Sequence, residues 1–409
     1  MDLGPAAPVR DTALESRLFP AAAEGGVSTH ALVEALLDSG SGISDLVFSP
    51  GRPPQVERHG ELMPVLVDGI TLLSPSQTAR IARDLIGGGS QVLTTLETEG
   101  ATDFSYSVAS RTRFRVNVFR QRGTYAIVMR VIASRIPTLD DLKLPASLGE
   151  VASLKNGIVL VTGPTGSGKS STLAAIIDRI NETRAEHILT IEDPIEFMHP
   201  HKKATIHQRQ LHADTPSFAL ALRAALRQAP KVILVGEMRD RETVEIAITA
   251  AETGHLVLST LHTIDATKTV ERIIGSFPQG DQQVIRTRLA SAFRYFIAQR
   301  LIPQTSGGRV AVLEILKSTL RTREYIEQGE KDGKSLLDAI NDGELDGMRS
   351  FDGEIERLVR EGVMTYATGL LYATNQGNLQ VRLADVAAAL KAAESPSGAP
   401  DDIESLIER

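Results

Sequence analysis

The chain contains neither cysteine nor tryptophan, and aromatic residues make up only 4% of its 409 residues. The lack of cysteine excludes disulfide bonds and thiolate zinc sites, and it fits a reducing compartment. No apolar run reaches the roughly 18 residues that a membrane-spanning helix needs. The start of the chain, Met1 to Pro5, is not followed by a basic region and an apolar core, so the sequence predicts no signal peptide. We therefore expect a cytoplasmic protein.

An excess of basic residues is also missing. Lysine and arginine number 44 against 51 aspartates and glutamates, which gives a net charge of −7. Nucleic-acid-binding domains usually carry a basic surface, so we expect no nucleic-acid partner. A hydrophobic content of 42% is ordinary for a globular protein with a large core. The length favours two domains.

The pattern of residues divides the chain into segments. Helix signals begin at Ser28 and at Ser74-Pro75-Gln77, the latter a capping box with proline at the first helical position. Strand signals lie at 46–48, 113–119 and 125–131, and together they predict a small α+β domain. The predicted order is a flexible extension (1–27), this N-terminal domain (28–135), an ordered linker (136–145), a second domain (146–393) and a disordered tail (394–409).

The second domain has the pattern of an α/β fold. Short apolar runs at 158–162, 188–192, 232–236 and 256–260 alternate with helical segments, which indicates a parallel sheet covered on both faces. Beyond Gln279 we expect a largely helical part. Its first helix would present Ile285, Leu289, Phe293 and Phe296 on one face, and further helices are predicted at 319–328, 334–341, 352–361 and 379–392.

The stretch from Gly163 to Ser170 matches the pattern G-x-x-x-x-G-K-S directly behind the first apolar run. Glycines in such a loop let backbone N–H groups turn toward phosphate oxygens. Lys169 would contact the β- and γ-phosphates, and the Ser170 hydroxyl would bind Mg²⁺. The sequence therefore predicts a nucleoside-triphosphate site made of Gly163, Pro164, Thr165, Gly166, Ser167, Gly168, Lys169, Ser170 and Ser171.

Polar residues end the other predicted strands, and parallel strands bring such ends to the edge that holds the phosphate loop. Glu192 would orient or deprotonate the attacking water, although two solvated acids in a turn remain an alternative. Glu237 follows an apolar strand in the Walker B arrangement. This arrangement predicts that its carboxylate binds Mg²⁺, directly or through water. Gly236 stands where many NTPases carry an aspartate, which leaves the division of labour between the two glutamates open.

Two histidines flank the last of these strands. His262 follows its carboxyl end, where an imidazole can donate to a γ-phosphate oxygen. His255 precedes the strand, and it is either a second nucleotide-binding residue or a packing residue. His199, His201, His207 and His212 lack regular ligand spacing, so they predict a surface loop rather than a metal site.

The strand at 113–119 alternates, so Phe114 and Val116 would face a core while Arg113 and Arg115 share the other face. These arginines are either a solvated basic edge or a source of positive charge for a nucleotide of the same or a neighbouring subunit. Arginine supplied to a transferring phosphoryl group is worth roughly 10³–10⁵ in rate.

The phosphate loop together with the segments at 188–197, 227–240 and 249–263 resembles the Walker A, Asp box, Walker B and His box of the type II/IV secretion (GspE/PulE-like) ATPases. The match is closest to the type IV pilus retraction, or twitching motility, ATPases of the PilT/PilU branch, and it runs from about Ser28 to Asp385. The resemblance implies a RecA-like P-loop core with a PAS-like N-terminal domain and a helical C-terminal part.

The resemblance also implies ATP and Mg²⁺ as ligands, a homo-hexameric ring and a type IV pilus platform protein of the inner membrane as partner. Two departures leave open whether the chain is the principal motor or an accessory one beside a paralogous retraction ATPase. Lys231 replaces an aspartate of the family, and residues 320–327 lack the retraction signature A-I-R-N-L-I-R-E. A pilus-assembly or type II secretion ATPase is the alternative within the superfamily, although such ATPases commonly carry a tetracysteine insert. A nucleic-acid motor and a non-hydrolysing nucleotide switch are alternatives of other classes.

Overall fold

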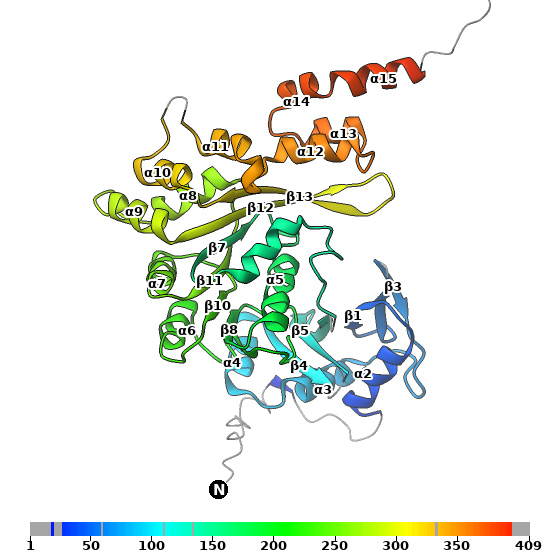
Figure 1. Cartoon of the computed structure of the whole chain (residues 1–409). Helices are drawn as coiled ribbons and strands as arrows, with labels where there is room; N and C mark the ends of the chain where they lie inside the picture. The colour runs from blue at the N-terminus through cyan, green and yellow to red at the C-terminus, as the bar shows by residue number, and fades with distance from the viewer. Residues whose placement is uncertain are drawn as a thin grey trace, which may run out of the picture. The chain divides into compact units, whose positions relative to one another are not determined.

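The computed structural model describes residues 18–19, 27–58, 60–108, 111–132, 135–331 and 334–394 (Figure 1). The chain divides into two compact units, an N-terminal one of residues 1–135 with 196–198 and a C-terminal one of residues 136–195 with 199–409. The rest of the predicted extension and nearly all of the predicted tail lie outside the described residues.

The N-terminal unit contains a six-stranded sheet in the part of it that the structure describes, in the order β3-β2-β1-β6-β5-β4. Every neighbouring pair is antiparallel. The strands at 46–48, 113–119 and 125–131 were predicted, whereas the shorter or more polar strands were not. The strands are β1 (Ile43–Phe48), β2 (Gln55–Arg58), β3 (Glu61–Pro64), β4 (Ala101–Val108), β5 (Thr112–Gln121) and β6 (Thr124–Ile132).

Helices α2 (Thr29–Asp38), α3 (Pro75–Ile86) and α4 (Ser90–Glu99) complete this unit. The predicted capping box of α3 is confirmed, since Gln77 N donates to Ser74 Oγ and Ser74 N donates to Gln77 Oε1. The core combines residues of the sheet and the helices, among them Leu36, Ile81 and Phe114. Leu18 and Phe19, within the predicted extension, are buried in the same core, so these two residues pack as part of the unit.

The C-terminal unit is built on a seven-stranded sheet in the order β13-β12-β7-β11-β10-β8-β9, counted over its described residues. All neighbouring pairs are parallel except β12 and β13, which form an antiparallel pair at one edge. The four predicted central strands are confirmed, and the predicted α/β class with them. The strands are β7 (Gly157–Thr162), β8 (His187–Glu192), β9 (Thr205–Gln210), β10 (Val232–Val235), β11 (Leu256–Leu261), β12 (Phe293–Pro303) and β13 (Arg309–Lys317).

Each face of this sheet is covered. One core joins alternate strand residues such as Leu160 and Ile233 to helices that include α6 (Phe218–Ala225), α7 (Arg241–Glu252), α8 (Ala266–Gly275) and α9 (Gln282–Ala292). The other joins the intervening residues, such as Val159 and Leu234, to α5 (Lys169–Thr183) and to the 3₁₀ segment η1 (Ala146–Ser153) (Figure 1). Leu144 of the predicted linker is buried in this second core. Central strands buried on both faces explain their near-continuous apolar runs.

The prediction of a largely helical part beyond Gln279 holds for α9 but is wrong for the strands β12 and β13 that follow it. Ile285 and Leu289 lie on α9, but Phe293 is the C-cap of that helix and Phe296 belongs to β12. Apolar residues on a fully buried strand can fall three and four positions apart, so the spacing alone did not distinguish strand from helix. The strand matters for function because it lies directly beside β7, with Ala298 paired to Thr162.

The predicted C-terminal helices are present, except that the one expected at 379–392 is interrupted and one further helix precedes it. They are α10 (Leu320–Gln328), α11 (Leu336–Asp342), α12 (Phe351–Arg360), α13 (Tyr366–Tyr372), α14 (Gln376–Arg382) and α15 (Ala384–Glu394), with a 3₁₀ turn η2 (Glu344–Asp346) between α11 and α12. Side chains of α12, α13 and α14 form a separate core with β12 and β13.

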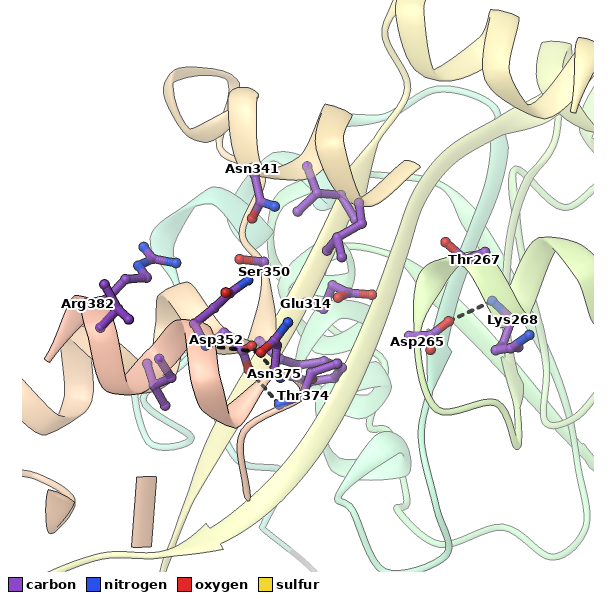
Figure 2. A pocket seen from close by; sticks show the side chains of 16 residues that line it. Asp265, Thr267, Lys268, Glu314, Asn341, Ser350, Asp352, Thr374, Asn375 and Arg382 are labelled. Carbon is purple, nitrogen blue, oxygen red and sulfur yellow. Dashed lines mark hydrogen bonds between the residues drawn. The ribbon is translucent and has the colours of Figure 1, made fainter. Parts of the chain in front are cut away.

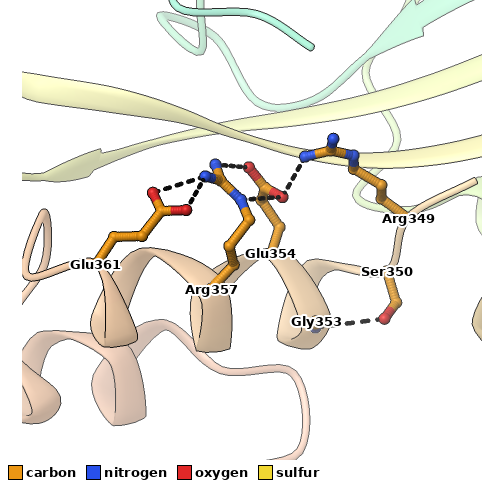
Figure 3. Close-up of polar contacts among 6 residues, drawn as sticks. All are labelled: Arg349, Ser350, Gly353, Glu354, Arg357 and Glu361. Carbon is orange, nitrogen blue, oxygen red and sulfur yellow. Dashed lines mark hydrogen bonds and ion pairs between the residues drawn. The ribbon is translucent and has the colours of Figure 1, made fainter. Parts of the chain in front are cut away.

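A buried carboxylate fastens α12 to this sheet (Figure 3). Glu354, 6% exposed, accepts hydrogen bonds from Arg349 Nη1 at 2.7 Å and from Arg357 Nη2 at 2.6 Å. Arg349 also exchanges backbone hydrogen bonds with Ile315 of β13. Burial alone would raise the pKa of Glu354, but the hydrogen bonds and charges of Arg357 and Arg349 outweigh it and hold the pKa below its ordinary value. The carboxylate therefore stays charged and links the helix to the strand.

Candidate active site

The phosphate loop joins the carboxyl end of β7 to the first residue of α5. Every residue of β7 is buried, and Gly168, the residue before the helix, has a left-handed conformation with φ 88° that favours glycine. The N-terminus of α5 follows the loop directly, and the first backbone N–H groups of a helix, which have no acceptor within the helix itself, favour anion binding. Lys169, 8% exposed, donates from Nζ to Gly163 O and Pro164 O, each at 3.0 Å.

The loop has no room for larger residues at two of its glycines. A Cβ at Gly163 would lie 2.3 Å from the backbone oxygen of Gln299, and a Cβ at Gly168 would lie 2.8 Å from Nε2 of the same residue. Ser167 Oγ is buried and has no hydrogen-bond partner among the described residues. A close glycine-lined turn lets backbone N–H groups approach phosphate oxygens, so this loop fits a triphosphate.

The predicted strand ends do converge beside this loop. Strands β7, β11, β10 and β8 are consecutive neighbours in the sheet and all run parallel. The backbone of Gly163 donates to Leu261 O at 3.3 Å, and that of Gly236 donates to Ile191 O at 2.7 Å. His262 and Glu237, which follow β11 and β10, and Glu192, the last residue of β8, therefore lie along the same edge as the phosphate loop.

Glu237 and His262 are in direct contact. Glu237 Oε1 lies 3.4 Å from His262 Nε2, and its Oε2 lies 2.8 Å from Arg239 Nε. The Glu237 side chain is 18% exposed, whereas that of His262 is 45% exposed. The carboxylate thus lies between the guanidinium of Arg239 and the imidazole of His262, and the imidazole has an accessible surface toward solvent.

Glu192 is held by different partners. Its Oε1 accepts hydrogen bonds from Thr190 Oγ1 at 2.5 Å and from Gln208 Nε2 of β9 at 3.0 Å. A Cβ at Gly236 would lie 3.4 Å from Glu192 Cα and 3.3 Å from Ile191 O. An aspartate at position 236, as many NTPases have, would press against the backbone that carries Glu192. Glycine at this position lets the end of β10 pack against the backbone at Ile191 and Glu192.

His255 lies at the opposite edge of the sheet. Its backbone oxygen accepts the hydrogen bond of Gly157 N at the start of β7, whereas the phosphate loop follows the other end of that strand. Its ring nitrogen Nδ1 lies 2.9 Å from Ala250 O and 3.3 Å from Thr253 Oγ1. The structure therefore supports the packing interpretation of His255 and does not bring it to the phosphate loop.

Arg113 and Arg115 belong to the N-terminal unit. On β5 the residues Phe114, Val116 and Val118 are buried, and Arg115 is exposed, as the alternation predicted. Arg115 Nε lies 3.7 Å from Asp103 Oδ1 of β4. The two side chains form an exposed ion pair, which restrains the arginine side chain only weakly.

The predicted histidine loop is partly a strand. His207 lies on β9, where its Nδ1 is 3.0 Å from His187 Nε2, and His199 is buried. This edge strand is mostly polar and contains one apolar residue, Ile206, so no apolar signal marks it in the sequence. Within the described part of the chain no group of three or more His, Cys, Asp or Glu side chains could hold a metal ion.

The side chains at the loop fit Mg²⁺ only together with a nucleotide. Mg²⁺ prefers oxygen ligands and is usually held by one or two carboxylates, waters and substrate phosphates rather than by an all-protein cage. Glu237 supplies a carboxylate and Ser170 a hydroxyl, and phosphate oxygens would complete such a set. This donor set agrees with the absence of a pre-formed metal cluster among the described residues.

A cavity of about 490 Å³ is lined by residues of β13, of the start of α8 and of the C-terminal helices α11, α12 and α14 (Figure 2). Glu314 of β13 lines it together with Asp265 and Asp352, and Glu314 is 5% exposed. Its Oε1 accepts the hydrogen bond of Ala266 N at 2.9 Å. The pKa of Glu314 is raised to about 7, mainly by burial and also by the two aspartates, while the Ala266 amide and Arg300 act in the opposite direction.

This pKa predicts a pH-dependent stability. A carboxyl group that binds its proton more tightly in the folded than in the unfolded chain stabilises the fold at low pH, and the stabilisation is lost as pH rises through the folded pKa. The rise from 4.5 to about 7 corresponds to a loss on the order of 3 kcal/mol between pH 4.5 and 7. Glu314→Gln removes this dependence, so above pH 7 the variant should be at least as stable as the parent chain.

The test is the urea midpoint of unfolding at pH 5.5, 7 and 8 for the parent chain and for Glu314→Gln. The exposed Glu344→Gln is the matched control, and it should follow the parent chain at every pH. Parallel pH profiles for the parent and Glu314→Gln would refute the assigned pKa.

Comparison with known proteins identifies one protein family over most of the chain. Residues 100–345 match the model of the family described as type II/IV secretion system protein. The chain is 41% identical to the type IV pilus retraction ATPase PilT of Pseudomonas aeruginosa over 79% of its own length and 92% of that protein. It is 38% identical to the type IV pilus ATPase PilU of the same organism, over 86% of its own length and 90% of that protein.

A solved structure is similar as well. The crystal structure of the pilus retraction motor PilT with bound ADP superposes with a TM-score of 0.78 at 38% identity. It covers 87% of this chain and all of the solved chain. The similarity therefore extends over both units.

Proposed function

Because this chain belongs to the type II/IV secretion system protein family and is an ATPase of that family, we propose that it hydrolyses ATP to power type IV pilus retraction. One observation carries the proposal: β7, which leads into the loop of Lys169, is one of four neighbouring parallel strands, and Glu192, Glu237 and His262 lie at or just after the carboxyl ends of the other three. A binding protein needs only the phosphate loop, whereas two carboxylates and an imidazole beside it suit hydrolysis.

Each side chain at this edge has one role in the proposed reaction. The loop amides and Lys169 hold the triphosphate, with Lys169 exchanging its two loop carbonyls for phosphate oxygens. Ser170 and Glu237 would hold Mg²⁺, which neutralises charge on the phosphates when bound. Glu192, fixed by Thr190 and Gln208, is placed to orient the attacking water. Either glutamate could accept the proton of that water.

Two further groups stabilise developing charge. His262, in contact with Glu237, would donate to a γ-phosphate oxygen and respond when that phosphate leaves. Arg113 and Arg115 would supply positive charge from the N-terminal unit of the same or a neighbouring subunit. A guanidinium at the transferring phosphoryl group accounts for roughly 10³–10⁵ of the rate in related reactions.

The assembly that we propose is a homo-hexamer acting at the cytoplasmic side of an inner-membrane pilus platform protein. Within it, the N-terminal unit would be the PAS-like domain and the C-terminal unit the RecA-like motor domain. Among the described residues, no helix combines the length and the apolar character that crossing a bilayer requires. Similarity to both PilT and PilU leaves the roles of principal and accessory motor as the two versions of the proposal.

Deletion of the gene followed by a count of surface pili tests this function. A retraction motor predicts more pili than in the parent strain and loss of twitching, because assembly continues without removal. A strain without pili would instead support an assembly motor. ATP turnover that rises severalfold with added DNA would favour a nucleic-acid motor, and binding without turnover would favour a nucleotide switch.

A further inference from the structure

Gln299 lies on β12, the strand that the sequence pattern did not reveal. The side chain is 3% exposed, and its strand pairs with β7 up to Thr162, the residue directly before the phosphate loop. A buried amide needs partners for both its oxygen and its nitrogen, since an unpaired buried polar atom costs about 1–3 kcal/mol. The identity of those partners shows what the side chain holds.

Both partners belong to the phosphate-loop segment. Gln299 Nε2 donates to Ser167 O at 2.7 Å, and Gln299 Oε1 accepts from Thr172 Oγ1 at 2.7 Å. Ser167 is in the loop, and Thr172 is in the first turn of α5. Residues 168–171 lie between them in the chain, and two of these, Lys169 and Ser170, are proposed to hold phosphate and metal.

The backbone of Gln299 restricts the same loop. Its carbonyl oxygen would lie 2.3 Å from a Cβ at Gly163, and its Nε2 would lie 2.8 Å from a Cβ at Gly168. Gln299 therefore contacts the loop at its first residue, at its last residue and in the following helix turn. Its two side-chain hydrogen bonds are both made to this segment, so the amide does not merely complete the pairing of the sheet.

We propose that Gln299 is a positioning residue of the ATPase, which clamps the phosphate loop in the conformation that receives the triphosphate. The proposal rests on the proposed role of residues 163–170 as the triphosphate site. Gln299 does not touch the reacting atoms. It acts through Ser167 and Thr172 on the direction of the loop amides and of Lys169.

Gln299→Met tests the clamp, because methionine has a similar length and no hydrogen-bonding amide. The loop holds phosphates in the ground state and in the transition state alike, so we expect KM for ATP to rise at least tenfold while kcat changes less than threefold. Binding of a fluorescent ATP analogue should weaken by a similar factor. These values are measured at a temperature at which circular dichroism shows the variant to be folded.

Thr172 supplies the matched pair of variants. Thr172→Val removes the donor to Gln299 Oε1 and should raise KM, whereas Thr172→Ser keeps the hydroxyl and should restore the parent value. Gln304→Met is the control, since Gln304 directly follows β12. Among the described residues, its Nε2 donates only to Gly307 O in the neighbouring turn. It should leave KM unchanged.

The outcomes separate the two proposals. If the folded Gln299→Met and Thr172→Val chains keep the parent KM and only melt at lower temperature, Gln299 is a packing residue and the clamp is refuted. If the parent chain itself neither binds nor hydrolyses ATP, the proposed function fails first. A raised KM in both variants, with Thr172→Ser and Gln304→Met unaffected, supports the clamp.

Discussion

Glu237→Gln leaves ATP bound to the chain and lowers turnover by about 10²–10⁴, the range that one general acid–base or metal-orienting carboxylate supplies. The carboxylate lies between His262 Nε2 at 3.4 Å and Arg239 Nε at 2.8 Å. It follows β10, which is separated from β7 in the sheet by β11. Glutamine keeps the shape and loses the charge, so the phosphate loop remains intact. Steady-state hydrolysis and binding of a fluorescent ATP analogue measure the two effects separately.

The control for this variant is Glu242→Gln. Glu242 is 53% exposed in the first turn of α7, and it pairs with Arg223, whereas Glu237 pairs with Arg239 and His262. It should retain the turnover of the parent chain. Hydrolysis by Glu237→Gln at the parent rate would remove Glu237 from the active site and leave Glu192 as the carboxylate that activates water.

Lys169→Ala has the second large expected effect, a loss of ATP binding itself. Lys169 is 8% exposed, and its amine reaches into the loop to Gly163 O and Pro164 O. Hydrogen bonds to charged groups are worth about 1.5–3 kcal/mol each, so losing the ammonium should weaken ATP binding roughly a hundredfold or more. Titration with the fluorescent analogue gives the affinity, and a thermal melt establishes that the variant is folded.

Lys155→Ala is the matched control, because Lys155 is a 78% exposed lysine of the same unit. Its removal should not change the affinity for ATP. Parent-like affinity in Lys169→Ala would show that the triphosphate binds without this loop, which the proposed function does not allow.

The parts of the fold that the sequence predicted depend on local signals. The capping box at Ser74 and Gln77 needs only four residues to be recognised, and the structure confirms it. The strands β7, β8, β10 and β11 are buried on both faces and so appear as short apolar runs between helices. Because parallel neighbours share an edge, the approach of Glu192, Glu237 and His262 to the phosphate loop followed from the same signals.

The features that were missed depend on tertiary neighbours. Edge strand β9 contains Ile206 as its single strongly apolar residue, so no periodicity marks it. The apolar residues at the start of β12 continue the helical spacing of α9, so the strand was missed. Its run of aromatic and branched residues and the Gly307-Gly308 turn before β13 were nevertheless available as hairpin signals. The partners of Gln299 and Gln208 come from distant segments, and no spacing along the chain predicts such contacts.

The central claim is that four strand ends surround one triphosphate, and a crystal or cryo-EM structure of the full chain with a non-hydrolysable ATP analogue and Mg²⁺ tests it most directly. The account predicts the γ-phosphate within hydrogen-bonding distance of Lys169 and His262, with Glu237 and Ser170 at the metal and Glu192 facing the attacking side. A triphosphate bound elsewhere, or one bound in the loop with Glu192, Glu237 and His262 turned away from it, would contradict the account.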